Sequence, residues 1–462
     1  MRKGFGLKNR IAYLLVFILL GTMVLSGCGG ETAPADTSAT VAFGGPVSME
    51  TAPVLTYEVP LMQPGILVDR IGYEAAGTKL ILVRGDRLPS AFDVVDANSK
   101  EVVFTGKLEE PAYDETTGEY NSYGDFSAFA TEGMYYVECD MIGQSHSFVI
   151  ENTLYDNLMS ETLAELAVSR KELENGDIGS VCECVSTLLL SYELFGNVYD
   201  RGTPEGAQPQ LISLIKEYII WLLATQDSQT GAVLSGDTVD KEQTAWLSAV
   251  LAKFSYTYQK FDSTYATVCL QAADRAWDYL QKAEDVPQEA MFYAAAELYR
   301  ATGQYAYHKE VKNLGTGVTL DAYNKAQVFG ALTYAFTKRN VDVDICAGMM
   351  KVLFAVAEDV AVRANDNFYM TGSGLKQGED ILLWEMILVS AIDYVITNHE
   401  YATMIEDHLH YLAGSNEDAV CHIRWSEKYA DDKEAGRTDV ERLAGYVMIL
   451  SEILSHRQEE TK

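Results

Sequence analysis

The sequence predicts a multidomain protein in which a β-sandwich of immunoglobulin (Ig) type precedes an all-α domain. Two observations lead to this prediction. Between residues 65 and 151, short runs rich in Val, Ile, Phe and Tyr alternate with Gly, Asp, Asn and Ser turns, which is typical of strands. From residue 152 to 462, apolar residues recur at helical spacing. We therefore expect a sandwich at 65–151 and a helical domain at 152–462.

The first 28 residues have the pattern of an export signal. Residues 1–10 carry four basic side chains and residues 11–25 are almost wholly apolar, as in a secretory signal peptide. The apolar run is shorter than the roughly 18 to 20 residues that a membrane span needs. It closes with the letters LSGC, which resemble a bacterial lipobox. The sequence thus predicts an extracytoplasmic lipoprotein, anchored to the bacterial membrane through a lipidated Cys28.

The composition of the rest limits the possible partners. Residues 29–64 are rich in Ala, Thr, Gly and Pro and lack periodicity, so we expect a flexible tether. The chain has 35 basic and 67 acidic residues and a formal net charge of -32. Binding of nucleic acid requires clustered Lys and Arg, and this charge argues against it. A neutral glycan remains a possible partner.

Cysteine and histidine spacing gives no sign of a metal site. Apart from Cys28, the six cysteines form no Cys-x-x-Cys pair and have no paired histidines, so a zinc site is not indicated and buried free thiols are expected. Calcium is compatible with the acidic composition, but there is no Asp-x-Asp-x-Asp-Gly run. We predict no cofactor.

Seven short runs predict the strands of the sandwich. They are separated by turn residues and lie within fewer than ninety positions: ILVDRIGY, TKLILVRG, AFDVVDA, EVVFTGKL, YGDFSAF, GMYYVECD and SHSFVIE.

About eleven or twelve helices fit between residue 154 and the C-terminus. The run LISLIKEYIIWLL places Leu211, Leu214, Tyr218 and Leu222 on one face. Prolines and glycines mark several predicted helix ends. Runs such as AAAELY and FGALTYAF are apolar on nearly all sides, which indicates helices buried on two faces. Paired helices stacked in rings satisfy this pattern better than a simple bundle.

The order of these elements, together with local motifs, resembles a known family. A sandwich followed directly by ringed helices, with ILVDRIGY, FDVVDA, GMYYVE, TLLLSYELF, AADRAWDYL, AAAELYRATGQYAY and HYLAGSN, is similar to glycoside hydrolase family 9 cellulases that carry an N-terminal Ig-like domain. The resemblance covers nearly all of residues 65–454. It implies an (α/α)6 barrel with a cleft for β-1,4-glucan and hydrolysis with inversion.

The resemblance assigns the base side of the reaction to ENGD, which precedes TLLLSYELF. Inversion uses an ionised carboxylate that activates a water and a protonated acid that donates to the departing oxygen. The family has Asp-Ala-Gly-Asp here, so Asp177 would be the base and Glu174 would hold the water. The family's following residues are replaced by Ile178, Gly179 and Ser180. Read locally, Asp177 is also an ordinary helix cap.

The proton donor is matched less directly. Family members end with an aspartate pair, a spacer and Asn-Glu-Val, whose glutamate is the donor. This chain has YADDKEAGRTDVERLAGYVMIL, in which Tyr429 and the aspartate pair match but no Asn-Glu follows. Asp439 and Glu441 flank the valine and are both candidates. Either can instead be a surface acid on an amphipathic helix.

Sugar contacts are expected from the segment before that motif. The family's His-His-Arg stretch is reduced to His422 and Arg424 in LAGSNEDAVCHIRW. Trp425 and Tyr429 could stack on pyranose faces, while core packing is the alternative for each aromatic residue.

Two functions stay open. The first is a lipid-anchored glycoside hydrolase that acts on β-1,4-glucan or a related polysaccharide by an inverting mechanism. The second is a catalytically impaired protein of the same fold that binds glycans or serves as a scaffold. They differ in whether Glu441 or Asp439 faces the same cavity as Asp177.

Overall fold

The computed structural model describes residues 64–460, apart from residues 116, 172, 174–176, 397 and 426–438. Three residues named above therefore lie outside the described part of the chain: Cys28, Glu174 and Tyr429. The predicted signal peptide and tether lie outside it as well.

The N-terminal domain is a sandwich of two sheets. One sheet has the order β1 (Ile66–Leu67), β3 (Leu80–Gly85), β7 (Glu119–Asp125) and β6 (Ala112–Asp114). The other has the order β2 (Tyr73–Glu74), β10 (Phe148–Glu151), β8 (Gly133–Cys139), β4 (Ala91–Asp96) and β5 (Val102–Lys107), with β9 (Gly143–Gln144) on β8. All pairs are antiparallel except β10 with β2. Each of the seven predicted runs contributes to a strand.

Aromatic side chains fill the space between the two sheets. Tyr73 packs edge-on against both Phe126 and Phe148, with ring centroids 5.2 Å apart in each case. Strand β4 alternates as expected for a half-buried strand, so that Phe92 and Val94 point inward. Val95 is also buried, although it does not belong to the core cluster that contains Phe92 and Val94. The register of β4 with β5 shifts after Val94. The short strands β6 and β9 were not predicted, because their few residues are mostly exposed and polar.

Twelve α-helices follow in the described part of the chain, in line with the predicted number. In chain order they are α1 (Leu154–Lys171), α2 (Ile178–Asp200), α3 (Gln210–Thr225), α4 (Lys241–Tyr258), α5 (Ser263–Leu280), α6 (Gln288–Thr302), α7 (Tyr305–Gly315), α8 (Lys325–Phe336), α9 (Val343–Asn365), α10 (Glu379–Asp393), α11 (Ala402–Leu412) and α12 (Val440–Glu460). The prolines at 209 and 287 stand at the starts of α3 and α6, and Gly303 ends α6 in a left-handed conformation.

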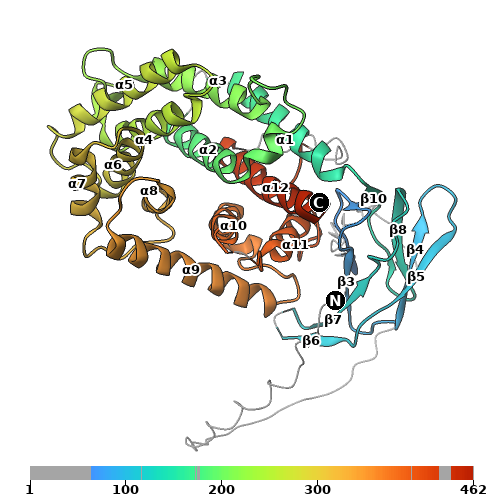
Figure 1. Ribbon diagram of the computed structural model, residues 1–462. Coiled ribbons are helices and arrows are strands. Elements are labelled where there is room, and N and C mark those ends of the chain that lie inside the picture. The colour runs from blue at the N-terminus through green and yellow to red at the C-terminus, as the bar shows by residue number, and fades with distance from the viewer. Residues whose placement is uncertain are drawn as a thin grey trace, which may run out of the picture. The chain divides into compact units, whose positions relative to one another are not determined.

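The even-numbered helices form the inner ring and the odd-numbered helices lie outside it (Figure 1). Around the inner ring, α2 contacts α4, α4 contacts α6, α6 contacts α8, and α12 contacts both α10 and α2. This is the predicted (α/α)6 barrel. The inner helices are apolar on several faces because they pack on both sides: α8 buries eight of its twelve residues and α10 twelve of its fifteen. Among the described helices, α2 alone has the length and composition of a membrane span, and it is mostly buried in the barrel.

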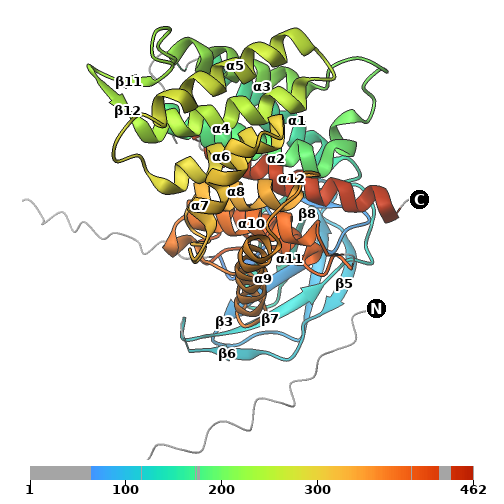
Figure 2. The ribbon, with the colours of Figure 1, turned by 60° about the vertical axis from the view of Figure 1, so that its left-hand side comes forward.

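The first turns of the six inner helices lie at one end of the barrel. Each inner helix is followed by an outer helix that returns the chain, so the six inner helices start at the same end. A hairpin of β11 (Val233–Ser235) and β12 (Thr238–Asp240) leads into α4 there (Figure 2). The hydrogen bonds described in the next subsection confirm that the starts of α2, α4, α8, α10 and α12 meet.

Candidate active site

Asp177 occupies the cap of α2, as local reading of the sequence predicted. Its Oδ2 accepts a hydrogen bond from the Ser180 amide at 3.0 Å, and Oδ1 accepts a longer one from Gly179. Gln243, in the first turn of α4, donates from Nε2 to Oδ1 at 3.3 Å. The carboxylate itself is exposed to solvent. It is therefore fixed at the mouth of the barrel and still accessible to a substrate.

Glu441 reaches the same place from the other end of the chain. It lies in the first turn of α12, and its Oε1 accepts a hydrogen bond from the hydroxyl of Ser180 at 3.1 Å. The amide nitrogen and hydroxyl of one serine are joined by three bonds of about 1.5 Å each. The carboxylate oxygens of Asp177 and Glu441 that contact Ser180 are therefore at most about 10 Å apart.

The structure separates the two candidates for the acid. Asp439 precedes α12 and is exposed. Its negative charge is one of several that raise the pKa of Arg442. Glu441 instead helps to line a pocket of ≈ 240 Å³. Only Glu441 of the two is linked to Asp177 through the described residues.

Four charged residues of this pocket were not singled out from the sequence, and two of them form an ion pair. Glu183, one turn beyond Ser180 in α2, is paired with Lys325 from the first turn of α8. Burial raises the pKa of Glu183, the Lys325 ammonium opposes that rise, and the charge of Glu441 adds to it. Acids and bases in helical runs look like ordinary surface residues in a sequence. The pattern therefore gave no sign of this pair.

The start of α10 supplies two more carboxylates. Arg442 donates to both oxygens of Asp380, at 2.5 and 3.1 Å, and its NH1 lies 3.7 Å from Glu379. The hydrogen bond from Arg442 lowers the pKa of Asp380, although burial works in the opposite direction. Asp380 thus remains ionised beside Arg442. The pocket combines a carboxyl whose pKa is raised with one whose pKa is lowered.

The predicted sugar-contact residues do not all converge on the site. His422 does so, because its Nδ1 lies 3.3 Å from Glu379, which Arg442 also contacts. Arg424 is exposed, and none of its described contacts reaches Asp177 or Glu441. Trp425 is half-buried, donating its indole N–H to Thr162 of α1 at 2.9 Å. Its ring lies edge-on to Tyr446 of α12. Trp425 is engaged in packing between helices.

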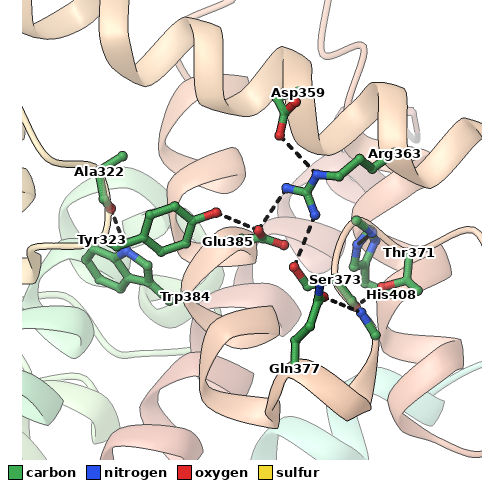
Figure 3. Close-up of polar contacts among 12 residues, drawn as sticks. Ala322, Tyr323, Asp359, Arg363, Thr371, Ser373, Gln377, Trp384, Glu385 and His408 are labelled. Carbon is green, nitrogen blue, oxygen red and sulfur yellow. Dashed lines mark hydrogen bonds and ion pairs between the residues drawn. The ribbon is translucent and has the colours of Figure 1, made fainter.

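Trp384 forms a wall of the pocket, and a polar network holds it (Figure 3). Its indole N–H donates to the Ala322 carbonyl at 2.8 Å, and the Lys325 ammonium lies 5.6 Å from its ring centroid. The next residue, Glu385, is buried and accepts from Tyr323 and Arg363, each at 2.8 Å (Figure 3). These bonds tie α9, α10 and the segment before α8 together. They fix the indole ring at the side of the pocket.

Comparison with known proteins places this arrangement in a family. Residues 62–144 match the cellulase N-terminal ig-like domain, and residues 220–424 match glycosyl hydrolase family 9. The chain belongs to glycosyl hydrolase family 9. Asp177 and Glu441 both lie outside the stretch matched to the hydrolase domain.

Relatives and solved structures cover both domains. A cellodextrinase from Butyrivibrio fibrisolvens is 22% identical over 472 residues, which is 78% of this chain and 84% of that protein. A metagenome-derived family 9 endoglucanase shares the fold with a TM-score of 0.70 at 17% identity, covering 84% of this chain and 99% of that one. A family 9 protein from Bacteroides ovatus gives 0.65 at 16% identity, with 85% and 99% covered. The family 9 fold thus extends over the sandwich and the barrel.

Proposed function

We propose that this family 9 protein is a lipid-anchored glycoside hydrolase that cleaves β-1,4-glucan with inversion, using Asp177 as base and Glu441 as acid. One observation carries the proposal. Two carboxylates from opposite ends of the chain both hydrogen-bond to Ser180, at the end of the barrel where the inner helices begin. A scaffold protein without activity would have no need to bring them together.

The positions of the two carboxylates suit the two halves of inversion. Asp177 lies at the N-terminus of α2, where two backbone N–H groups hold its carboxylate in place, and a carboxylate held in this way can serve as the base. It would take a proton from a water as that water attacks the anomeric carbon. Glu441 would give its proton to the departing glycosidic oxygen. Inverting pairs stand roughly 6.5–9.5 Å apart, which is compatible with the upper limit of about 10 Å set by Ser180.

Ser180 is suited to act with Glu441 at both stages. A serine hydroxyl can accept from a protonated carboxyl and donate to an ionised one. It can thus hold the Glu441 side chain in one orientation before and after proton transfer. We assign Ser180 the role of a positioning residue, which contacts the acid and not the substrate.

The substrate class is supported by relatives and by charge. The relatives include proteins named cellodextrinase and endoglucanase. The net charge of -32 disfavours anionic substrates and is compatible with a neutral glucan. The side-chain amide of Gln243, at the mouth of the barrel, is a group that suits sugar hydroxyls.

Sugar release from soluble β-1,4-glucan tests the proposal. Asp177→Asn and Glu441→Gln should each lower the rate by about a hundredfold or more, the order expected when an acid or base is removed. Asp439→Asn is the matched control, because this exposed acid lies two residues from Glu441, and it should retain activity. Absence of release by the folded wild-type protein from glucans and xylan would favour a glycan-binding function.

The membrane anchor is tested separately. Cys28→Ser should move the protein from the membrane fraction to the soluble extracytoplasmic fraction in a bacterial host, because no acyl chain would then be attached. Wild-type protein found in the soluble fraction would contradict the anchor without affecting the proposed chemistry.

A further inference from the structure

A second cluster of chemically active side chains lies at the far ends of α10 and α12, the helices whose first turns carry Asp380 and Glu441. Asp393 is the last residue of α10 and His399 follows in the next loop. Glu452 and His456 lie in the last turns of α12. The proposed hydrolysis uses none of these four residues.

The donor atoms of Asp393, His399 and His456 are spaced as ligands of one ion. Oδ2 of Asp393 lies 3.0 Å from Nδ1 of His399 and 3.3 Å from Nε2 of His456. Nε2 of His456 lies 3.7 Å from Oε1 of Glu452. A tetrahedral ion with bonds of about 2.0–2.1 Å separates its ligand atoms by roughly 3.3–3.4 Å. The donor atoms of Asp393, His399 and His456 all lie within 4.8 Å of one another.

The carboxylates of the cluster are buried and oriented. Asp393 and Glu452 are 0% and 1% exposed. The Tyr401 amide donates to Oδ1 of Asp393 at 2.8 Å and so turns Oδ2 toward the two imidazoles. This is the kind of outer contact that orients ligands in metal sites. Glu452 is buried beside them, with Nε2 of His456 3.7 Å from its Oε1. A buried carboxylate of this kind either takes up a proton or is balanced by a cation.

We propose that Asp393, His399 and His456 bind one divalent transition-metal ion of the Zn²⁺ class, with the carboxylate of Glu452 beside His456. Two imidazoles favour zinc and its first-row neighbours over Ca²⁺ and Mg²⁺, which prefer all-oxygen sites. Two carboxylates balance the charge of a divalent ion when both imidazoles are neutral. A pocket of ≈ 1060 Å³ that His456 helps to line gives the ion a path from solvent.

The role of the ion follows from where its ligands are. It would join the end of α10, the loop after it and the end of α12. The other ends of these two helices carry Asp380 and Glu441. The ion would therefore brace two inner helices that present the candidate site. It would stabilise the folded protein by RT ln(1 + L/Kd), where L is the free concentration of the ion. This inference does not rest on the proposed function.

Metal content and thermal stability provide the test. The full-length protein, stripped with a chelator and titrated with Zn²⁺ alone, should bind one ion per chain and unfold at a higher temperature. His399→Gln and His456→Gln should each weaken zinc binding by about tenfold or more. His308→Asn, in the partly buried histidine of α7, is the control and should bind like the wild type. Co²⁺ in place of zinc should give the visible absorption of a tetrahedral site.

The alternative to a bound metal ion is that the two imidazoles of the cluster are protonated. Two protonated imidazoles would also balance Asp393 and Glu452. In that case the stripped wild-type protein would bind no zinc at micromolar concentration, and its unfolding temperature would not change. Either that result or equal zinc binding by the wild type and both glutamine variants would overturn the proposal. The wild-type titration decides even where a variant fails to fold.

Discussion

Replacing His410 with glutamine should destabilise the protein by an amount that depends on pH. His410, in α11, contacts Asp69 in the sandwich, with Nδ1 2.7 Å from Oδ2 and side chains only 12% and 2% exposed. The other oxygen of Asp69 accepts from the amides of Ile71 and Gly72, so the carboxylate cannot turn away. The pair joins the two domains.

The size of the effect follows from the pKa of His410. Burial acts to lower this pKa, but the hydrogen bond and charge of Asp69, with Glu406 and Asp407 nearby, raise it from 6.5 to about 9. Because the folded pKa is raised, the stabilisation is fully present below pH 6.5 and is lost as the pH rises through 9. Such a shift corresponds to about 3 kcal/mol.

Urea unfolding of the wild type and His410→Gln at pH 6 and pH 10 measures this difference. The loss of stability caused by the substitution should be about 3 kcal/mol larger at pH 6 than at pH 10. Comparing the two proteins at each pH cancels groups that titrate alike in both. Asp69→Asn should remove the same pH dependence. An equal loss at both pH values would refute the account of a charged pair.

Three further substitutions test the site and its support. Ser180→Ala should lower kcat about tenfold with little change in KM, because Glu441 loses its positioning contact. Ser180→Thr should restore kcat. An unchanged kcat in Ser180→Ala would show that Ser180 does not position the acid. Arg363→Met should lower the free energy of unfolding, measured in urea, by about 3 kcal/mol, since Glu385 would be left buried without its cation. An unchanged free energy of unfolding would mean that this network contributes nothing to stability. Gly330→Ala should cost about 1–3 kcal/mol, because its Cβ would lie 2.6 Å from the ring of Phe292; stabilisation would instead show that helix propensity outweighs this contact.

The order of elements was accessible from the sequence because it depends on local patterns. Alternation and turn residues located the strands, and Pro209, Pro287 and Gly303 marked helix ends that the structure confirms. The expected free thiols are also present, since all six cysteines other than Cys28 are unpaired and most are buried. Each of these features is decided by a residue and its immediate neighbours.

The convergence of the site could be foreseen only in part. Asp177 and Glu441 were each identified from resemblance, but their link through Ser180 depends on ring closure between α2 and α12, which no local pattern encodes. Glu183 and Lys325 were missed for the same reason. The histidine cluster shows this clearly, because His399 and His456 are far apart in sequence and meet only when α10 and α12 pack.

The assignment of base and acid is tested most directly by comparing two substrates. One is a cello-oligosaccharide, and the other is an aryl cellobioside whose dinitrophenolate leaving group needs no protonation. We predict that Glu441→Gln loses about a hundredfold or more on the oligosaccharide but remains near the wild-type rate on the aryl substrate, whereas Asp177→Asn loses activity on both. If Glu441→Gln is impaired equally on both substrates, or on neither, Glu441 is not the proton donor and the central claim is wrong.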